Sequence, residues 1–320
     1  MKKMLAFALL TVVGLLFFTA CGDGGTATNP STNPPAAATS PVAQPNPAPA
    51  AAPAPAAPAP ATTTPITGPI DVISRESGSG TRDAFVDILG ILEGGVDRTY
   101  IEAVIQTGTG AVITAVAGNL YSIGYISLGA LRDDVRAMPI NGVAPSAANV
   151  QAGTYPLFRT FYLAVPRNLE SLAQDFLDFI LSAEGQAIVS GRNYIAVGDN
   201  LAPFTGGGLT GTLEITGSTS IAPLMELLAV AYMEINDDAR IEVHSSGSGA
   251  GITDAIEGRA AFGMVSRELR PTELESVDAV AMAYDGLAVI VHNDNPIPSL
   301  TTEQVRDIFM GELSRWGDTQ

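Results

Sequence analysis

Residues 70–85 read IDVISRESGSGTRDAF, and this segment passes from a strand pattern through a Gly/Ser loop into a helix pattern. The alternating apolar residues at its start predict a short β-strand, and the apolar residues from position 84 onward recur at helical spacing. The first amide groups of such a helix have no partner within the helix, and the helix dipole adds partial positive charge beside them. A strand, a glycine-containing loop and a helix N-terminus in this order therefore predict a site for an anion.

The side chains of this segment suit an oxyanion. Gly80 lets the backbone approach a ligand closely, and Ser79 and Thr81 offer hydroxyl donors. Arg75 offers a planar fork of donors that matches the oxygens of an oxyanion. A Gly/Ser loop by itself is more often only a turn that caps a helix. The arginine beside it, and the recurrence of the pattern in residues 241–252 (IEVHSSGSGAGI), favour a ligand site here.

The composition limits the class of protein. The chain has 320 residues and is 46% hydrophobic, which is enough for two domains with a sizeable core. Its net charge is -17 and its lysines lie only at positions 2 and 3, so we expect no nucleic-acid partner. This acidity is compatible with an anion site, because the amides and the single arginine of a closed cleft act locally.

The first 68 residues are expected to precede the folded part. Residues 1–21 combine Lys2 and Lys3 with an apolar run that ends at Cys21, and they predict a signal peptide that is too short for a transmembrane helix. The segment resembles a bacterial lipoprotein signal, in which the cysteine is lipidated, with palmitate among the acyl groups, and becomes the first mature residue. Secretion without a lipid is the alternative. Residues 22–68 are rich in Pro, Ala and Thr and predict a disordered linker.

The chain offers little for metal or cofactor chemistry. A single cysteine excludes an intrachain disulfide and a multi-cysteine metal site. His244 and His292 each end an apolar run, so we interpret both as ordinary strand-end residues. We therefore expect no metal, no cofactor and no catalytic residue.

From about residue 69 the patterns of strands and helices alternate, which indicates an α/β fold. A Gly/Thr turn at residues 107–110 (TGTG) opens a further helix. The clearest elements are buried strands at 158–165, 261–265 and 287–291 and helices at 169–189 and 302–310.

Four motifs together resemble those of the phosphate-binding lipoproteins of phosphate-specific ABC transporters. They are RESGSGTR at 75–82, TGSTS at 216–220, GSGAG at 247–251 and YDGLAV at 284–289. The resemblance covers about residues 69–320. It implies a two-lobed, type II-like periplasmic-binding-protein clamshell with phosphate between the lobes. It also implies a non-enzymatic monomer, anchored by lipid to the outer side of the cell membrane, that binds inorganic phosphate with high affinity and delivers it to an ABC transporter permease.

The resemblance implies which residues would contact phosphate. Ser266 departs from the family, because many members have there an aspartate that accepts a proton from phosphate. A hydroxyl rejects fully deprotonated oxyanions less strongly, which leaves the exclusion of sulfate open. Ser77 stands where the family often has the acid that orients the arginine, so Glu76 or Asp83 would have to orient Arg75. The implied ligand residues are Arg75, Ser79, Gly80, Thr81, Ser218, Thr219, Ser220, Ser248 and Ser266.

The order of the motifs predicts a circular permutation. In the family the Ser-Thr-Ser half comes first, whereas here it follows the half that contains Arg75. One lobe would then consist of residues 69–155 and 294–320 and the other of residues 156–293, and such rearrangement is tolerated where termini are close at the surface. The connector at 199–211 would join the family's old ends.

This permutation makes two geometric demands. Gln320 must lie near Pro69, within roughly 15 Å, the reach of about four extended residues. The Arg75 loop must also face the Thr219 and Ser248 loops across one cleft. A dimer that builds each clamshell from two chains remains the alternative.

Other functions stay open at this point. The ligand could be another tetrahedral oxyanion, such as sulfate or molybdate. The chain could also be a surface adhesin or a non-functional fragment that keeps the fold. A hydrolase is disfavoured, because the sequence has no Gly-x-Ser-x-Gly elbow and no histidine placed as a base.

Overall fold

The computed structural model describes residues 65–320. The predicted signal peptide, Cys21 and nearly all of the predicted linker lie outside the described residues. Within residues 65–320, no helix has the length and apolar character needed to cross a membrane.

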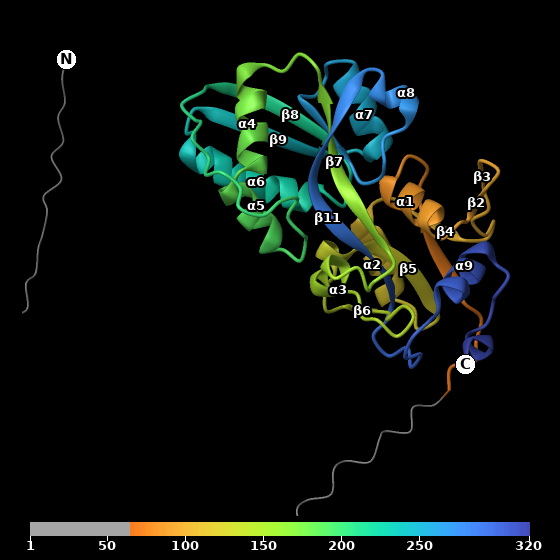
Figure 1. The fold of residues 1–320 in the computed structure, drawn as a ribbon. Helices are drawn as coiled ribbons and strands as arrows, with labels where there is room; N and C mark the ends of the chain where they lie inside the picture. Colours follow the sequence, from red (N-terminus) through yellow and green to blue (C-terminus); the bar gives the residue numbers. More distant parts are fainter. Residues whose placement is uncertain (1–64) are drawn as a thin grey trace, which may run out of the picture. The chain divides into compact units, whose positions relative to one another are not determined.

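A mixed sheet of nine strands extends through the described part of the chain (Figure 1). Its order is β4–β1–β5–β11–β7–β10–β8–β9, with β6 paired to β11. The strands are parallel at both ends of the sheet, whereas β11 and β7 run antiparallel to each other and to their outer neighbours. The strands are β1 (Asp71–Arg75), β4 (Val104–Gln106), β5 (Ser122–Ser127), β6 (Val135–Ala137), β7 (Phe158–Pro166), β8 (Gly211–Gly217), β9 (Ala239–Ser245), β10 (Phe262–Val265) and β11 (Val277–His292), and a separate hairpin joins β2 (Leu92–Glu93) to β3 (Val96–Asp97).

The helices alternate with these strands, which confirms the predicted α/β class. The single helix predicted at 169–189 is wrong. Ser182 leaves helical geometry and its hydroxyl accepts from the amide of Gly185, so one helix ends and a second begins there. The helices are α1 (Gly80–Ile88), α2 (Thr109–Ala117), α3 (Ala147–Gln151), α4 (Ser171–Leu181), α5 (Ala183–Ser190), α6 (Ala222–Ile235), α7 (Ser248–Ile256), α8 (Pro271–Leu274) and α9 (Thr302–Met310).

Strand β11 takes part in two hydrophobic cores. Met282 and Ala283 belong to one core, whereas Leu287 and Val289 belong to the other. The chain also changes core where β7 begins, between Leu157 just before the strand and Phe161 within it. We call residues 65–157 and 287–320 the first lobe, and residues 158–286 the second lobe.

The predicted lobe boundary at residue 293 lies past this change of core. Leu287 and Val289 face one side of the first lobe's sheet, and Ala288 and Ile290 face the other side. The predicted strand 287–291 is therefore buried on both faces, but in the first lobe.

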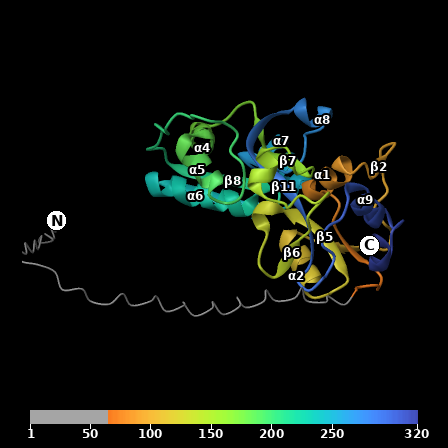
Figure 2. The same ribbon diagram turned by 60° about the horizontal axis from the view of Figure 1, so that its bottom comes forward.

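The end of the chain lies beside the start of the folded part. The side-chain amide of Gln320 donates to the carbonyl of Ile66 at 3.2 Å, and a β-bridge joins Pro69 to Arg315. Figure 2 shows the C-terminus and α9 beside the orange start of the described chain, as Figure 1 does from another side. This contact confirms the expected proximity of Gln320 and Pro69.

Candidate anion-binding site

Four strand–loop–helix units meet at one place between the lobes. The first lobe contributes the loops before α1 and α2, and the second lobe contributes the loops before α6 and α7. The amide of Gly249 donates to the carbonyl of Gly78 at 3.1 Å, which joins the loop before α1 to the start of α7. Each helix N-terminus brings backbone amides and partial positive charge to the same place, an arrangement suited to an anion.

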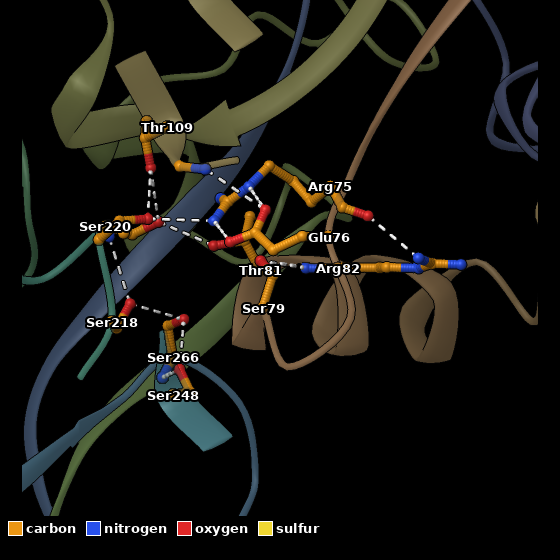
Figure 3. A network of polar contacts seen from close by, with 12 residues as sticks. Arg75, Glu76, Ser79, Thr81, Arg82, Thr109, Ser218, Ser220, Ser248 and Ser266 are labelled. Carbon is orange, nitrogen blue, oxygen red and sulfur yellow. Dashed lines mark hydrogen bonds and ion pairs between the residues drawn. The ribbon is translucent and has the colours of Figure 1, made fainter. Parts of the chain in front are cut away.

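Arg75 lies at the centre of this cluster and is 1% exposed (Figure 3). Its Nη2 donates to the hydroxyl of Thr219 in the opposite lobe at 3.1 Å. Its Nη1 is buried and has no hydrogen-bond partner among the described residues. A buried donor without an acceptor is costly, and an oxyanion between the lobes would supply the acceptor. The contact with Thr219 also confirms that the Arg75 loop faces the Thr219 loop.

Glu76 orients Arg75. Its two carboxylate oxygens accept from Nε and Nη2 of Arg75, both at 2.8 Å, and one also accepts from the amide of Gly108 at 3.3 Å. Burial alone would raise the pKa of Glu76, but the hydrogen bond and charge of Arg75 outweigh it and hold that pKa below its ordinary value. The carboxylate is therefore ionised and fixes the plane of the guanidinium.

The alternative that Asp83 orients Arg75 is wrong. Asp83 lies in the first turn of α1 and its carboxylate accepts from Nε of Arg267 at 2.9 Å. Arg267 belongs to the second lobe and also pairs with Glu273. Asp83 therefore connects the two lobes next to the cluster instead of orienting the arginine.

Hydroxyl groups from both lobes complete the cluster (Figure 3). The hydroxyls of Thr81 and Ser220 lie 2.8 Å apart across the lobes. In the second lobe the hydroxyl of Ser218 donates to that of Ser266 at 2.9 Å, and the hydroxyl of Ser248 lies 3.3 Å from the same oxygen. These five residues are buried, so their hydroxyls are withdrawn from bulk solvent.

Ser79 and Gly80 have different positions in the cluster. Ser79 caps α1, because its hydroxyl accepts from the amide of Arg82 at 3.3 Å. Gly80 touches the opposite lobe, and a Cβ atom there would overlap Ser248 Oγ and lie 2.8 Å from Ser266 Oγ. The structure thus places all the predicted ligand residues in the four converging loops and the neighbouring end of β10, while their role as ligands stays a prediction.

Thr109 is a member of the cluster that the sequence reasoning missed. Its hydroxyl lies 3.2 Å from that of Thr219 and 3.3 Å from that of Ser220. A signal was present, because TGTG at 107–110 repeats the alternation of SGSG at 246–249. The glycine before each helix has nearly the same conformation, with φ 85° and ψ 159° at Gly108 and φ 91° and ψ 151° at Gly247.

The two histidines lie outside this cluster. His244 contacts Glu214 at 2.7 Å on exposed parts of β9 and β8. The ring of His292 accepts from the amide of Asp294 beyond the end of β11. Within residues 65–320, neither imidazole is placed to act as a base for the buried hydroxyls.

Comparisons with known proteins find clear similarity over most of the chain. A family model described as a PBP superfamily domain matches residues 57–184 and 202–320. The phosphate-binding protein PstS 2 of Streptococcus pneumoniae is 45% identical over 254 residues, which cover 78% of this chain and 87% of that protein. PstS 2 of Streptococcus agalactiae is 38% identical over 258 residues, with 78% and 88% covered. A crystal structure of a phosphate-binding protein of a phosphate ABC transporter from Streptococcus pneumoniae is similar with a TM-score of 0.65 and 45% identity, and the match covers 79% of this chain and all of that one.

Proposed function

The chain belongs to the PBP superfamily and, within it, to the family of PstS phosphate-binding proteins, and on this premise we propose that it binds inorganic phosphate outside the cytoplasm and delivers it to the permease of an ABC transporter. One observation carries the proposal. Arg75 is buried between two lobes, inside a set of hydroxyls and helix N-termini, and its Nη1 has no hydrogen-bond partner within residues 65–320. Such a site offers donors to a small anion and excludes solvent from it.

The hydrogen-bond donors of the site favour an oxyanion. They discriminate only weakly between a protonated oxyanion such as phosphate and a fully deprotonated one such as sulfate. Nη1 of Arg75 and the helix amides suit the charged oxygens, and the hydroxyls can donate or accept. Ser266 replaces the carboxylate that many members of the family use to accept the proton of phosphate, so sulfate is the second candidate ligand. We propose binding without catalysis, because the relatives are named as phosphate-binding proteins.

Calorimetric titration of the purified full-length chain with phosphate and with sulfate tests this function. We expect phosphate to bind and sulfate to compete at an excess. Absence of binding to either anion would overturn the proposal. Binding of phosphate with no sulfate competition would show that a group other than Ser266 accepts the phosphate proton.

We also propose that Cys21 carries a lipid that holds the protein on the outer side of the cell membrane. The apolar run that ends at the single cysteine of the chain supports this. In the native host, Cys21→Ser should release the protein from membranes, as measured by fractionation after a high-salt wash. A variant that stays on the membrane would contradict lipid anchoring.

The permutation and the monomeric state remain proposals with structural support. The permutation requires that the two ends of the folded part lie together, and Gln320 contacts Ile66. A monomeric site requires that both sets of loops meet within one chain, and Arg75 contacts Thr219. A rearranged gene that joins Gln320 directly to Ile66 and begins near residue 211 should give a monomer that binds phosphate with wild-type affinity. Light scattering and calorimetry measure both properties. A wild-type dimer with sites built from two chains would replace permutation with a swap.

A further inference from the structure

A buried ion pair lies where the chain passes between the lobes. Arg159 on β7 and Asp285 on β11 are direct partners in the antiparallel register. The next pair along is Phe158 with Gly286, and the residues beside it, Leu157 and Leu287, belong to the core of the first lobe. The Arg159 side chain is 3% exposed and that of Asp285 is 0% exposed.

The pair connects the first lobe to a residue of the candidate site. Nε and Nη2 of Arg159 donate to one oxygen of Asp285 at 3.1 and 3.0 Å. The other oxygen of Asp285 accepts from the hydroxyl of Ser127, at the end of β5, at 2.9 Å. Nη1 of Arg159 donates to the backbone carbonyl of Ser266 at 3.1 Å. One continuous set of hydrogen bonds therefore runs from the first lobe to Ser266.

Stability alone does not account for this pair. Removing two charges from water costs several kcal/mol per ion, and well-packed apolar residues of similar volume are often as stable or more stable. Burial raises the pKa of Asp285 even though Arg159 opposes the shift, and burial likewise lowers the pKa of Arg159. The guanidinium also lies over the ring of Phe161, 4.9 Å from its centroid, so its orientation is fixed on more than one side.

Ser266 turns its other polar groups toward the site. Its hydroxyl meets those of Ser218 and Ser248, and its amide donates to Ser248 Oγ at 3.2 Å. Nη1 of Arg159 donates to the backbone carbonyl of Ser266. A change at that carbonyl would rotate the peptide and move the hydroxyl that faces the other lobe at Gly80.

We propose that Arg159 and Asp285 are positioning residues of the anion site. Arg159 sets the orientation of Ser266, and Asp285 fixes Arg159 between Ser127 and the site. The inference rests on the proposed phosphate-binding function. The part of it that concerns the orientation of Ser266 is testable without a ligand.

The double variant Arg159→Met/Asp285→Leu separates positioning from stability. It replaces both charges by apolar side chains of comparable size, so no unpaired charge stays buried. Its matched control is Arg167→Met/Asp278→Leu, which removes an exposed arginine–aspartate pair joining the end of β7 to β11. Both are made in the full-length chain and compared with the wild type by urea unfolding, by phosphate calorimetry and by amide hydrogen exchange of Ser266 without phosphate.

We expect the two double variants to unfold at urea concentrations close to that of the wild type. The Arg159/Asp285 variant should bind phosphate about tenfold more weakly or worse, and the Ser266 amide should exchange about tenfold faster or more. The control should change neither property. Unchanged Ser266 exchange in the Arg159/Asp285 variant would overturn the proposal, whatever happens to phosphate binding.

A second variant keeps the test decisive if the double variant does not fold. Arg159→Lys retains a charge beside Asp285, but one ammonium group cannot reproduce three donors in a plane. It should speed Ser266 exchange and weaken phosphate binding by a smaller factor, and unchanged exchange would again overturn the proposal. If the wild type binds no phosphate, the proposed function fails, and Ser266 exchange still decides whether the pair positions this residue.

Discussion

The two lobes bring the same backbone unit and different side chains to one site. In both lobes a glycine of nearly equal φ and ψ precedes a helix, at Gly108 in the first lobe and Gly247 in the second. The first lobe adds the charged pair Arg75–Glu76, whereas the second lobe adds neutral hydroxyls such as that of Ser248. The repeated unit therefore supplies amides from both sides, and the charge that selects an anion comes from one side alone.

This difference predicts an unequal division of binding energy. Glu76 holds Nε and Nη2 of Arg75 within the first lobe, in addition to the hydrogen bond from Nη2 to Thr219 of the second lobe. The second lobe contributes hydroxyls, such as that of Ser220, which contacts Thr81 of the first lobe. These contacts require the two lobes to be close together. The loss of phosphate affinity on substitution should accordingly depend more on whether the removed group is charged than on the lobe in which it lies.

Arg75→Ala should have the largest effect on phosphate affinity. Charge-assisted hydrogen bonds contribute about 1.5–3 kcal/mol each, so the loss should be about tenfold to hundredfold. Calorimetry measures it, with Arg132→Ala as a control, because Arg132 is an exposed arginine of the same lobe. Wild-type affinity in Arg75→Ala would remove the proposed inequality and place the site elsewhere.

Gly80→Ala should come next, because it tests contact between the lobes without changing any charge. The added Cβ would meet Ser248 Oγ and Ser266 Oγ, and overpacking of this kind costs about 1–3 kcal/mol, or about fivefold or more in affinity. Gly110→Ala is the matched control, since that glycine also lies at a helix start but faces open space. Equal affinities of the two variants would mean that ligand binding does not require this contact.

Ser248→Ala and Thr109→Val should have smaller and similar effects, although they lie in opposite lobes. Each removes one neutral hydroxyl, which contributes about 0.5–1.5 kcal/mol, or about twofold to tenfold. Thr114→Val, on the exposed side of α2, serves as the control. A much larger loss in Ser248→Ala than in Thr109→Val would show that position matters beyond the chemistry of the group.

The smallest effect should be the pH dependence that Glu76 gives to stability. Because its pKa is lowered in the folded protein, Glu76 stabilises the fold above the ordinary pKa of a glutamate, and this contribution disappears as the pH falls through the lowered value. The difference in free energy of unfolding between wild type and Glu76→Gln should thus be constant near neutral pH and decrease in acid. Urea unfolding across that range measures it, and a difference that grows in acid would contradict the assignment.

The sequence predicts those structural features that depend on residues adjacent in the chain. The loop from Arg75 to Thr81 was readable because its strand, glycines and helix start follow one another directly. The break at Ser182 was not, because the apolar spacing continues through it while one hydroxyl caps a new helix. The Gly/Thr turn that contains Thr109 is predictable from the sequence, but the distance of Thr109 from Thr219 depends on how the lobes meet.

Contacts between distant segments were beyond sequence reasoning. Arg159 and Asp285 are 126 positions apart and become partners only through the register of two long antiparallel strands. Strand β11 was predicted over 287–291 alone, because the part from Val277 onward mixes polar and small residues. The choice between Glu76 and Asp83 likewise required knowing that Arg267 from the other lobe takes Asp83.

The closeness of Gln320 to Ile66 has a mechanical consequence. The chain before residue 65 enters the first lobe, and a tension applied through it would act on the contacts of residues 66–70 with residues 314–320. The second lobe is a continuous insertion between Leu157 and Leu287 and lies outside that load path. A pull from this end would therefore act first on the lobe that carries Arg75, and it would reach the other lobe only through β7, β11 and the contacts between the lobes, such as that of Asp83 with Arg267.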